Sequence, residues 1–396
     1  MIGTNHEDTR KFNQAVVFET IRKSGPISRV EIAGRTGLRN QTITNITREL
    51  LECGLLAETG KVQGKRGQPQ TLLEVCEQAA CSIGIQIDKG VMTARLVDIN
   101  LNTLASHRLE MNSLDPYYIV NELASVIRLL SSRISPTQTL WGAGIALATL
   151  LDNRTPADLL SPGWGVWKGF DLVGELRKQI EIPIYVENDA TAAAIGSRVS
   201  GQGQKLNNFV YLYIGNGIGA GIIVNGQPYK GSWNNAGEVG RIQWPNEGRL
   251  EFVEKLLSIS GLSRALECPE SELMMADFIH DQLSLKSPRL IKWLDDAASR
   301  LKFVINILEN MLEPESIIIG STLPNELLHT LLSHASPLPP SICVTASREH
   351  PRVMIAPQYN NIVATGAAAI PIYAAGNPKL FHLFNCSHSS PPLLTP

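Results

Sequence analysis

Apolar side chains near the amino terminus recur at the spacing of one helical face. Within residues 10–24 the apolar positions include Phe12, Val16, Val17 and Ile21, and this spacing places their side chains on one side of a helix. Such a stripe must be covered by other elements to be stable in water. The pattern therefore predicts a first helix in a small helical domain.

A second and a third helix follow, separated by a short turn. The second is predicted to begin at Ser28, because Ser28 and Glu31 form the capping-box pattern, and to end near Gly37. It is expected to bury three apolar side chains: Val30, Ile32 and Ala33. The third helix runs from about 40 to 53, and Gly54 supplies its C-terminal stop. Its inner stripe consists of Ile43, Ile46, Leu50 and Leu51. Two helices joined by a short glycine-containing turn predict a helix-turn-helix.

The outer face of the third helix is rich in side chains that can read DNA. It presents Arg39, Asn40, Gln41, Thr42, Thr44, Asn45 and Arg48. Arginine suits guanine, asparagine and glutamine suit adenine, and threonine suits a phosphate or a thymine methyl group. The alternative is a helical domain whose polar surface side chains only face water.

A basic turn after the third helix favours DNA binding over that alternative. Residues 55–59 and 71–75 are interpreted as two strands around the turn QGKRGQPQ, with Lys65 and Arg66 at its tip. Such a wing is placed to enter a minor groove. Residues 1–78 carry 11 basic and 9 acidic side chains. Because the domain is only slightly positive, its affinity should depend on dimerisation and on few phosphate contacts.

The rest of the chain repeats one strand pattern. Residues 82–110 and 208–231 each have the pattern of a strand, a tight turn and further strands. Around them lie predicted helices at 117–134 and 172–180, predicted strands at 142–147, 184–186 and 316–319, and a buried alanine-rich helix at 364–375. Repetition of this kind predicts two related α/β lobes with a cleft between them. Ligand sites in such sheets lie at strand ends that face the cleft.

Composition indicates the class of protein and its compartment. The chain has 396 residues, a net charge of −2 and 43% hydrophobic residues, which is enough for two or three globular domains. The near-neutral charge gives no global signal for nucleic acid or membrane, so any DNA contact must be local. Six cysteines without a CxxC pair argue against a disulfide framework and fit a reducing cytosol. Because neither a signal peptide nor a run of ~20 apolar residues is found, we expect a cytoplasmic protein with no membrane partner.

Three stretches are specific in combination. They are VENDATAAAIG at 186–196, GNGIGAGIIVNGQPYKGSWNNAGEVG at 215–240 and IIIGS at 317–321. Together they resemble the ROK family of repressors and sugar kinases. The motif GPISRVEIAGRTGL and the wing sequence KRGQP resemble the repressor branch of that family, which includes the N-acetylglucosamine repressor. The resemblance runs from about residue 13 to 375, and it implies an actin/hexokinase-like fold, a sugar in the cleft, and a homodimer or homotetramer.

The predicted fold class is α/β, with an N-terminal winged helix-turn-helix followed by a two-lobed actin/hexokinase-like domain. The winged domain is expected over residues 1–78. The first lobe is expected over 79–192, completed by a C-terminal helix at about 362–375, and the second lobe over 193–361. The tail, 376–396, is rich in proline and serine and is expected to be mobile.

Asn188 and Asp189 end a predicted strand, which places them at the mouth of the cleft. The resemblance matches Asp189 to the aspartate that accepts the sugar hydroxyl proton in the family's kinases, and a carboxylate there suits general-base work or plain hydrogen bonding. The alternative is a helix cap before Ala190. The resemblance matches Glu238 to a sugar-contacting glutamate and, across a shortened loop, Glu251 to a second one. The candidate effector-binding residues are therefore Asn188, Asp189, Glu238 and Glu251.

The zinc ligands of the family have no counterpart in this chain. Arg241 stands where the family has a histidine, and IQWPNEGRLE replaces its cysteine cluster. Because a structural zinc needs four ligands, mostly nitrogen or sulfur, no metal site is expected. Arg241 is either a salt-bridge replacement for the metal, with Glu238 or Glu251 as its partner, or an anchor for a ligand.

Two loops near the expected sugar site leave the identity of the ligand open. Family members have Pro-Gly in a loop that passes over the sugar, where this chain has Ala148 and Thr149. Trp164 and Trp167 follow downstream, and they either stack on a sugar or pack inside the protein.

The first hairpin turn argues against a working ATP site. Family kinases have an aspartate and Gly-Gly-Thr there for Mg-ATP, whereas the aligned residues here are Gln86, Asp88, Lys89 and Gly90. Asp88 would place negative charge against a triphosphate, although phosphoryl transfer needs neutral or positive donors and a metal ion. The second turn keeps three glycines: Gly215, Gly217 and Gly219. A tight turn needs glycine in any case. No cofactor is therefore expected.

These patterns predict a sugar-responsive DNA-binding transcriptional regulator, a repressor and not an enzyme, whose partners are operator DNA and a sugar or sugar-phosphate effector. Effector binding would change lobe closure or subunit packing and so move two winged domains relative to paired half-sites. The alternative from another class is an active ROK-type sugar kinase that carries a DNA-binding domain. A regulator released by a protein partner is a third hypothesis.

Overall fold

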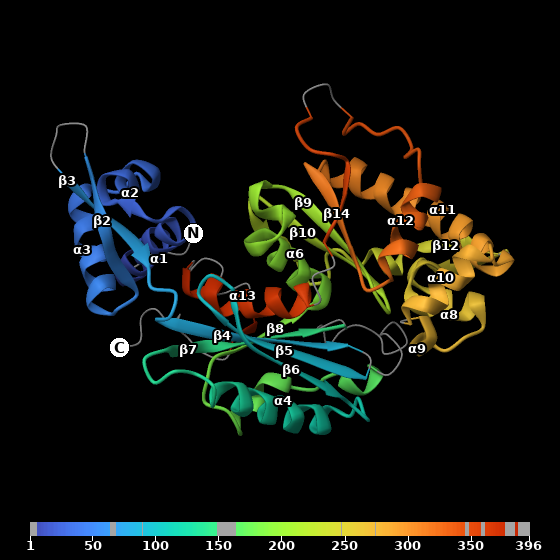
Figure 1. The fold of residues 1–396 in the computed structure, drawn as a ribbon, viewed down its shortest axis with the longest axis horizontal. Coiled ribbons are helices and arrows are strands. Elements are labelled where there is room, and N and C mark those ends of the chain that lie inside the picture. The colour runs from blue at the N-terminus through green and yellow to red at the C-terminus, as the bar shows by residue number, and fades with distance from the viewer. Residues whose placement is uncertain are drawn as a thin grey trace.

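The structure of the protein is a computed structural model, shown in Figure 1. It describes residues 6–63, 69–88, 90–148, 164–246, 248–273, 275–344, 348–357, 361–376 and 385–386. A small N-terminal domain, blue in Figure 1, lies beside the first of two larger α/β lobes. None of the helices in the described ranges is long and apolar enough to cross a membrane.

The N-terminal domain contains the predicted helix-turn-helix. Its elements are α1 (His6–Ser24), β1 (Ile27–Ser28), α2 (Arg29–Thr36), α3 (Asn40–Glu52), β2 (Leu56–Gln63) and β3 (Pro69–Val75), with the strands in the order β1-β3-β2. The capping box is present, because Ser28 Oγ accepts from the Glu31 N–H and the Glu31 carboxylate accepts from the Ser28 N–H at 3.0 Å. Gly37 ends α2 in the left-handed region, at φ 70°. The wing tip, with Lys65 and Arg66, lies outside the described residues.

One predicted core residue of α2 is wrong. Val30 is 55% exposed, whereas Ile32 is fully buried and Ala33 packs partly against the same core. Residues two apart on a helix differ by about 200° around its axis, so Val30 cannot share the inward face with Ile32. The inner stripe of α3 is confirmed, with Ile43, Ile46 and Leu50 buried and Leu51 partly buried.

The first lobe is a six-stranded sheet with helices on both faces. Its strands are β4 (Ala80–Asp88), β5 (Val91–Asp98), β6 (Thr103–Glu110), β7 (Thr139–Leu147), β8 (Ile184–Asn188) and β16 (Asn385–Cys386), in the order β16-β8-β7-β4-β5-β6. The isoleucines of β4 share a core with α4 (Pro116–Ser131) and α5 (Leu172–Arg177). On the other face lies α13 (Ile362–Gly376), red in Figure 1. Gly84 and Gly144 face α13, because a side chain at either position would collide with its backbone.

The second lobe is a five-stranded sheet built on the second hairpin. Its strands are β9 (Phe209–Ile214), β10 (Ile218–Val224), β11 (Gln227–Pro228), β14 (Ser316–Ser321) and β15 (Val353–Ile355), in the order β11-β10-β9-β14-β15. Its helices are α6 (Asp189–Ser200), α7 (Glu254–Leu257), α8 (Ile259–Leu266), α9 (Glu270–Leu273), α10 (Ala276–Ser284), α11 (Pro288–Leu312) and α12 (Asn325–His334). A two-stranded sheet pairs β12 (Gln243–Asn246) with β13 (Arg249–Phe252). The sheet lies between a core shared with α8, α11 and α12 and one shared with α6.

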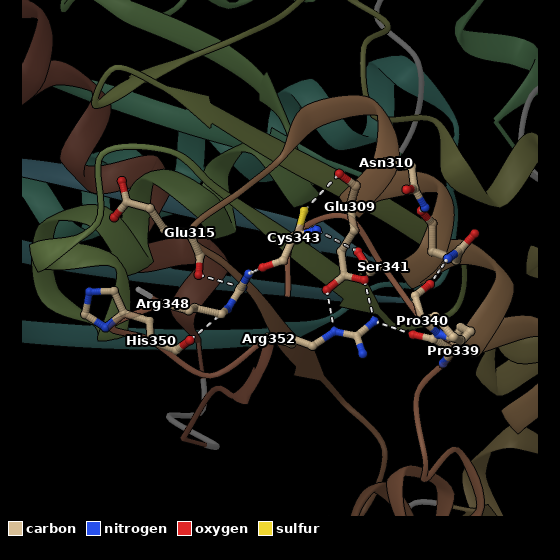
Figure 2. Close-up of polar contacts among 11 residues, drawn as sticks. Glu309, Asn310, Glu315, Pro339, Pro340, Ser341, Cys343, Arg348, His350 and Arg352 are labelled. Carbon is tan, nitrogen blue, oxygen red and sulfur yellow. Dashed lines mark hydrogen bonds and ion pairs between the residues drawn. The ribbon is translucent and has the colours of Figure 1, made fainter. Parts of the chain in front are cut away.

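A polar network fixes the chain between α12 and β15 to the end of α11 (Figure 2). The guanidinium of Arg352 donates to both carboxylate oxygens of the fully buried Glu309, at 2.8 and 2.6 Å. Arg348 donates to three backbone carbonyls, those of Cys343, Glu315 and His350. Because a bidentate pair satisfies a buried carboxylate, this network anchors the edge strand β15.

The N-terminal domain shares a hydrophobic core with the first lobe. Helix α1 packs against α13, and the ring of Phe18 in α1 meets that of Trp141 in β7 edge-on, with centroids 5.8 Å apart. Helix α13 in turn lies against α6, and the two helices approach closely at Gly196 and Gly366, where a side chain would collide with the facing backbone. One continuous set of contacts therefore joins α1, α13 and α6.

Little of the tail that the sequence predicts to be mobile is described. Gly376 ends α13, and β16 pairs antiparallel with β8, so that Asn385 lies opposite Val186 and Cys386 opposite Tyr185. The other residues of 376–396 lie outside the described part of the chain.

Candidate functional site

The strand end that carries Asn188 and Asp189 is also the start of α6. Asn188 Oδ1 accepts from the N–H groups of Ala190, at 2.9 Å, and Thr191, at 3.3 Å. Asp189 Oδ1 also accepts from the Ala190 N–H, at 2.8 Å. The helix cap weighed as an alternative therefore exists. Since the Asn188 amide group and the second Asp189 oxygen are not used by the cap, both side chains can still contact a ligand.

Strand β10 brings Glu238 toward this strand end. Gly219 of β10 packs against Ala190, and a Cβ added there would lie 2.8 Å from the Ala190 Cβ. The next residue, Ala220, donates its N–H to the carbonyl of Gly237 at 2.8 Å, and Glu238 follows directly. Gly237 adopts φ 96°, a conformation that side chains rarely allow. Both acidic residues of the candidate site are thus positioned against one strand.

The acidic groups of this site are held in a poorly solvated setting. The Asp189 side chain is partly exposed, but burial, together with the carboxyl groups of Asp88 and Glu238, raises the pKa of Asp189 to about 8. Burial raises the pKa of Glu238 to about 7, with Arg241 opposing the shift and Glu254 adding to it. Near neutral pH both carboxyl groups therefore retain a proton for much of the time, and each can donate to a ligand as well as accept.

Arg241 forms a salt bridge, but the expected partner is wrong. Its Nη1 lies 2.9 Å from Oε1 of Glu254, at the start of α7, and its guanidinium lies 5.5 Å from the centre of the Phe252 ring. The sequence pointed instead to Glu238 or Glu251. Glu254 is the partner because Gly240 has no side chain, so that α7 can approach the 3-10 turn that ends at Arg241.

Glu251 lies in β13, in the small hairpin with β12. Its Oε2 accepts from Asn246 Nδ2 at 3.0 Å, and it stands opposite Trp244 in the strand register. No described contact joins Glu251 to Asn188, Asp189 or Glu238. Its role as a second sugar ligand stays a prediction.

The β12–β13 hairpin occupies the position in the chain where the family's cysteine cluster would lie. Trp244 meets Phe303 of α11 edge-on, with centroids 4.9 Å apart, and the guanidinium of Arg300 lies 5.8 Å from the centre of the Trp244 ring. In the described part of the chain no group of three or more His, Cys, Asp or Glu side chains is placed to hold a metal ion. Aromatic and arginine contacts thus fix this hairpin to α11.

The two hairpin turns bond to each other across the lobes. Asn216 Nδ2 donates to Asp88 Oδ1 at 3.0 Å, and Gln86 Nε2 donates to the Tyr213 hydroxyl at 3.4 Å. The first bond joins the β4–β5 turn to the β9–β10 turn, and the second joins strands β4 and β9. Lys89 lies outside the described residues. Two residues that face a nucleotide in the family's kinases are therefore engaged with the opposite lobe here.

A cavity of about 1250 Å³ lies beside these turns. Its lining includes Gln86, Asp88, Tyr211, Tyr213, Asn216 and Gly320. Asp189 and Glu238 are not among its lining residues, although Asp88 is close enough to raise the pKa of Asp189. The candidate effector residues therefore lie next to this cavity and not within it.

The loop expected to pass over the sugar is described only at its start. Ala148 follows β7, whereas Thr149 and the residues to 163 lie outside the described part of the chain. Trp164 and Trp167 are 2% and 8% exposed, lie 5.2 Å apart between ring centroids and belong to the core of the first lobe. Both side chains therefore pack inside the protein and are not available to stack on a sugar.

The candidate DNA-reading side chains lie on the outer face of α3. Arg39, Asn40, Gln41, Thr44 and Arg48 are exposed, and Thr42 and Asn45 are partly buried. Asn45 Oδ1 accepts from Gln41 Nε2 at 3.3 Å and from Arg48 Nη2 at 3.4 Å. Three of the candidates therefore form one connected polar group on this face.

Sequence reasoning missed a buried ion pair beside the candidate site. Lys230 Nζ lies 2.6 Å from Glu187 Oε2, with side chains 8% and 4% exposed. The same carboxylate accepts from the Asn188 N–H at 2.9 Å. The signal was present, because Glu187 interrupts an otherwise apolar strand and a buried charge needs a partner. Nothing local could have identified Lys230 as that partner.

Comparison with known proteins identifies related chains. The family model described as ROK family matches residues 82–372. A xylose repressor of Bacillus spizizenii is 27% identical over 323 residues, 79% of this chain and 83% of that protein. The DNA-binding transcriptional dual regulator NagC of Escherichia coli K12 is 26% identical over 240 residues, 60% of this chain and 59% of that protein.

Solved structures share the fold. A ROK family transcriptional regulator, described as a homolog of the E. coli Mlc protein, superposes with a TM-score of 0.72 at 21% identity, covering 95% of this chain and 98% of that one. The ROK hexokinase of Thermus thermophilus superposes with a TM-score of 0.57 at 18% identity, covering 73% and 96%. The regulator thus matches the N-terminal domain as well as the lobes, whereas the hexokinase covers less of this chain.

Proposed function

Because the chain belongs to the ROK family, we propose that it is a sugar-responsive transcriptional repressor that acts in the cytoplasm. Relatives named xylose repressor and NagC support this assignment. The observation that carries it is the packing between the two working parts. Helix α6, which begins at the candidate sugar residues, lies on α13, and α13 lies on α1 of the winged domain. A ligand at Asp189 is therefore mechanically connected to the DNA reader.

The proposed division of labour follows the lobes. Residues 1–78 bind operator DNA, with α3 in the major groove and the wing in the minor groove. Residues 79–192 with 362–375, and residues 193–361, form the two sides of the effector cleft. A homodimer or homotetramer presents two winged domains to paired half-sites. The proposed DNA contacts are Arg39, Asn40, Gln41, Thr42, Thr44, Asn45 and Arg48 of α3, and Lys65 and Arg66 of the wing.

The proposed effector is a sugar or sugar phosphate held by acidic and amide groups. Asn188 and Asp189 lie at the end of β8, Glu238 follows Gly237 beside β10, and Glu251 is the fourth candidate. Adjacent sugar hydroxyls can each donate to, or accept from, a carboxyl group whose pKa lies near neutrality. Effector binding would shift the lobes and lower operator affinity.

The cross-lobe bonds favour a regulator over a working kinase. Asp88 is bonded to Asn216 and Gln86 to Tyr213 where a kinase would place metal and phosphates. Sugar kinases share the fold, so this alternative needs a direct test. We expect no ADP release from ATP across a panel of hexoses and amino sugars in a coupled assay. Turnover at even ~1 s⁻¹, ordinary for a kinase, would overturn the repressor-only proposal.

The DNA assignment is tested by fluorescence anisotropy on operator DNA. Arg66→Ala should weaken binding to all sequences, because a wing-tip arginine meets the groove and backbone. Gln41→Ala or Asn45→Ala should relax the preference at one base pair, by roughly 1–3 kcal/mol for a lost bidentate contact. Arg133→Ala, exposed after α4, is the matched control and should change nothing. Unchanged DNA affinity of the Arg66→Ala variant at moderate salt would show that the wing does not contact the DNA.

The effector assignment is tested by thermal shift and by release from DNA. A ligand at a hundredfold excess over its Kd stabilises the folded state by about 2.7 kcal/mol. Asp189→Ala should lose this shift while the unliganded protein stays folded. Operator DNA should weaken sugar binding by the factor by which the sugar weakens DNA binding. Release of DNA by a protein partner with no response to any carbohydrate would replace the proposed effector class.

A further inference from the structure

The charged groups around the candidate effector site are unevenly balanced. Five carboxyl groups gather there, those of Asp88, Glu187, Asp189, Glu238 and Glu254. The described cations that form ion pairs with them are Lys230 and Arg241, and the exposed Lys255 also acts on Glu254. Whether either cation is available to a ligand decides which class of sugar the site can hold.

Lys230 is committed to Glu187. The ion pair is 2.6 Å long and both side chains are more than nine-tenths buried. Turning the ammonium group toward a ligand would leave the Glu187 carboxylate buried without its cation, which is strongly unfavourable. Lys230 therefore fastens the loop before Glu238 to β8 and offers no charge to an anion.

Arg241 is committed to Glu254 in the same way. The pair is 2.9 Å long, the side chains are 18% and 15% exposed, and Phe252 lies under the guanidinium. Glu254 also raises the pKa of Glu238, against the opposing effect of Arg241. The positive charge at this position is thus already paired with Glu254.

The second hairpin turn is also a poor place for a phosphate. The Gly215 N–H donates to the Gly217 carbonyl at 2.9 Å, so it does not point to a ligand. The Asn216 side chain faces Asp88. A Cβ on Gly217 would lie 3.3 Å from Oε2 of Glu254, so a carboxylate borders the turn on that side too. An anion in this turn would lie between two acids.

The last two acids of the site are Asp189 and Glu238. Asp189 and Glu238 form no ion pair with any described cation, and the pKa of each is raised, Asp189 to about 8 and Glu238 to about 7. Each is therefore partly protonated near neutrality and can exchange hydrogen bonds with hydroxyl groups. A bound anion would instead raise these pKa values further.

We propose that the effector is a sugar without a phosphate or carboxylate group, and that the cleft rejects the phosphorylated form of the same sugar. The committed ion pairs of Lys230 and Arg241, with Asp189 and Glu238 outside every described ion pair, carry this inference. It rests on the proposed function, since it names the class of sugar for that site. Arg108 and His107 line the large cavity, and neither forms a described ion pair with Asp189 or Glu238.

Matched ligand pairs test the proposal by calorimetry on the full-length protein. The pairs are xylose and xylose 5-phosphate, glucose and glucose 6-phosphate, and N-acetylglucosamine and its 6-phosphate. One neutral sugar should bind, and its phosphate should bind at least tenfold more weakly, with less discrimination at high salt because charge repulsion is screened. Equal or tighter binding of the phosphate would overturn this inference alone. Failure of every ligand in all pairs would overturn the sugar site and the inference together.

Variants separate charge from general damage to the site. The double variant Asp189→Asn, Glu238→Gln keeps the side-chain shapes but removes both acids. The ratio of the dissociation constant of the phosphorylated sugar to that of the neutral sugar should therefore fall by at least tenfold. Glu181→Gln, an exposed acid before β8, should leave the ratio unchanged. An unchanged ratio in the double variant would show that these acids do not exclude phosphate.

Discussion

The two hairpins, β4–β5 and β9–β10, share a frame and differ in their turns. In each, strand glycines lie against a helix: Gly84 faces α13, and Gly221 faces α6, so closely that a side chain would collide with helix backbone. The turns have no such constraint. The first contains Asp88 and a single glycine, Gly90, whereas the second contains Gly215 and Gly217. The difference indicates that packing against a helix constrains the strand glycines, whereas the turn residues can differ between the two hairpins.

The two turns contact each other. Asp88 accepts from Asn216 at 3.0 Å, so Asp88 is a hydrogen-bond partner for the opposite lobe. The strands of the first hairpin can therefore be retained when its turn residues differ, because these strands are also the core of the lobe.

The largest expected effect tests the shared frame. Gly84→Val and Gly221→Val should each cost about 3 kcal/mol or more, or prevent folding, because the added atoms meet backbone that cannot move. Urea unfolding measures the loss. Gly34→Ala in α2, with nothing within 4 Å of the added atom, is the control and should be neutral or stabilising. A mild effect at Gly84 would mean that α13 packs more loosely than described.

A second test asks whether the ion pair between Lys230 and Glu187 also holds the second hairpin to the first lobe. Lys230→Met leaves Glu187 buried without its cation and should cost about 3 kcal/mol. The cost should shrink as pH falls, because burial already raises the pKa of Glu187 and protonation removes the stranded charge. Adding Glu187→Gln should restore most of the stability. No recovery in the double variant would show that Lys230 stabilises the fold through other contacts.

A third test concerns Asp189, where a substitution is expected to stabilise the protein and not to destabilise it. The pKa of Asp189 is about 8 in the folded protein, against 3.8 as the ordinary value. As pH rises above about 4, the unfolded chain releases this proton while the folded protein keeps it, so the folded state loses stability until about pH 8. Asp189→Asn removes that loss and should raise the melting temperature at neutral pH by roughly 2–4 °C, the shift that about 1 kcal/mol produces in a domain of about 150–250 residues.

The pH profile of that variant is the control. The gain should be largest at about pH 8 and above and should vanish near pH 3.5, where wild-type Asp189 is protonated in both states. A gain that does not depend on pH would assign the effect to something other than the carboxylate charge. Loss of stability at every pH would contradict a raised pKa.

The smallest expected effect tests the bond between the turns. Asn216→Ala and Asp88→Asn should each change the free energy of unfolding by about 1 kcal/mol, because both groups are partly exposed and the bond between them is single. A double-mutant cycle with Asp88→Ala and Asn216→Ala measures their coupling. Zero coupling would mean that the turns are neighbours without a bond.

Local patterns in the sequence predicted most of the fold. The capping box at Ser28, the glycine stop at Gly37 and both hairpins follow from residues close together in the chain, and the structure has them where expected. Val30 was wrong because residues two apart on a helix cannot share one face, so that Ile32 faces the core and Val30 faces water. Sequence alone also left the cap and ligand roles of Asn188 open, and the structure adds the cap.

Pairings between distant residues could not be predicted. Lys230 meets Glu187 and Asn216 meets Asp88 only because the lobes fold against each other, whereas Arg241 meets Glu254 within the second lobe. Arg241 and Glu254 are near in sequence, yet closer acids were available, and the choice was made by a glycine that lets α7 approach. The charge balance of the site depends on these pairings, so the class of ligand becomes an inference only with the structure.

The edge-on contact of Phe18 with Trp141, and the seating of α1 on α13 (Figure 1), bear on how such regulators can be recombined. A chimera that joins a foreign winged domain to this chain at residue 79 would place an unmatched helix against Trp141 and α13. An isolated N-terminal domain that ends at residue 78 would expose Phe18, which is fully buried in this structure, to water. Exchange of DNA-binding domains between such regulators therefore requires transfer of α1 together with the surface of α13 that contacts it, and not of residues 1–78 alone.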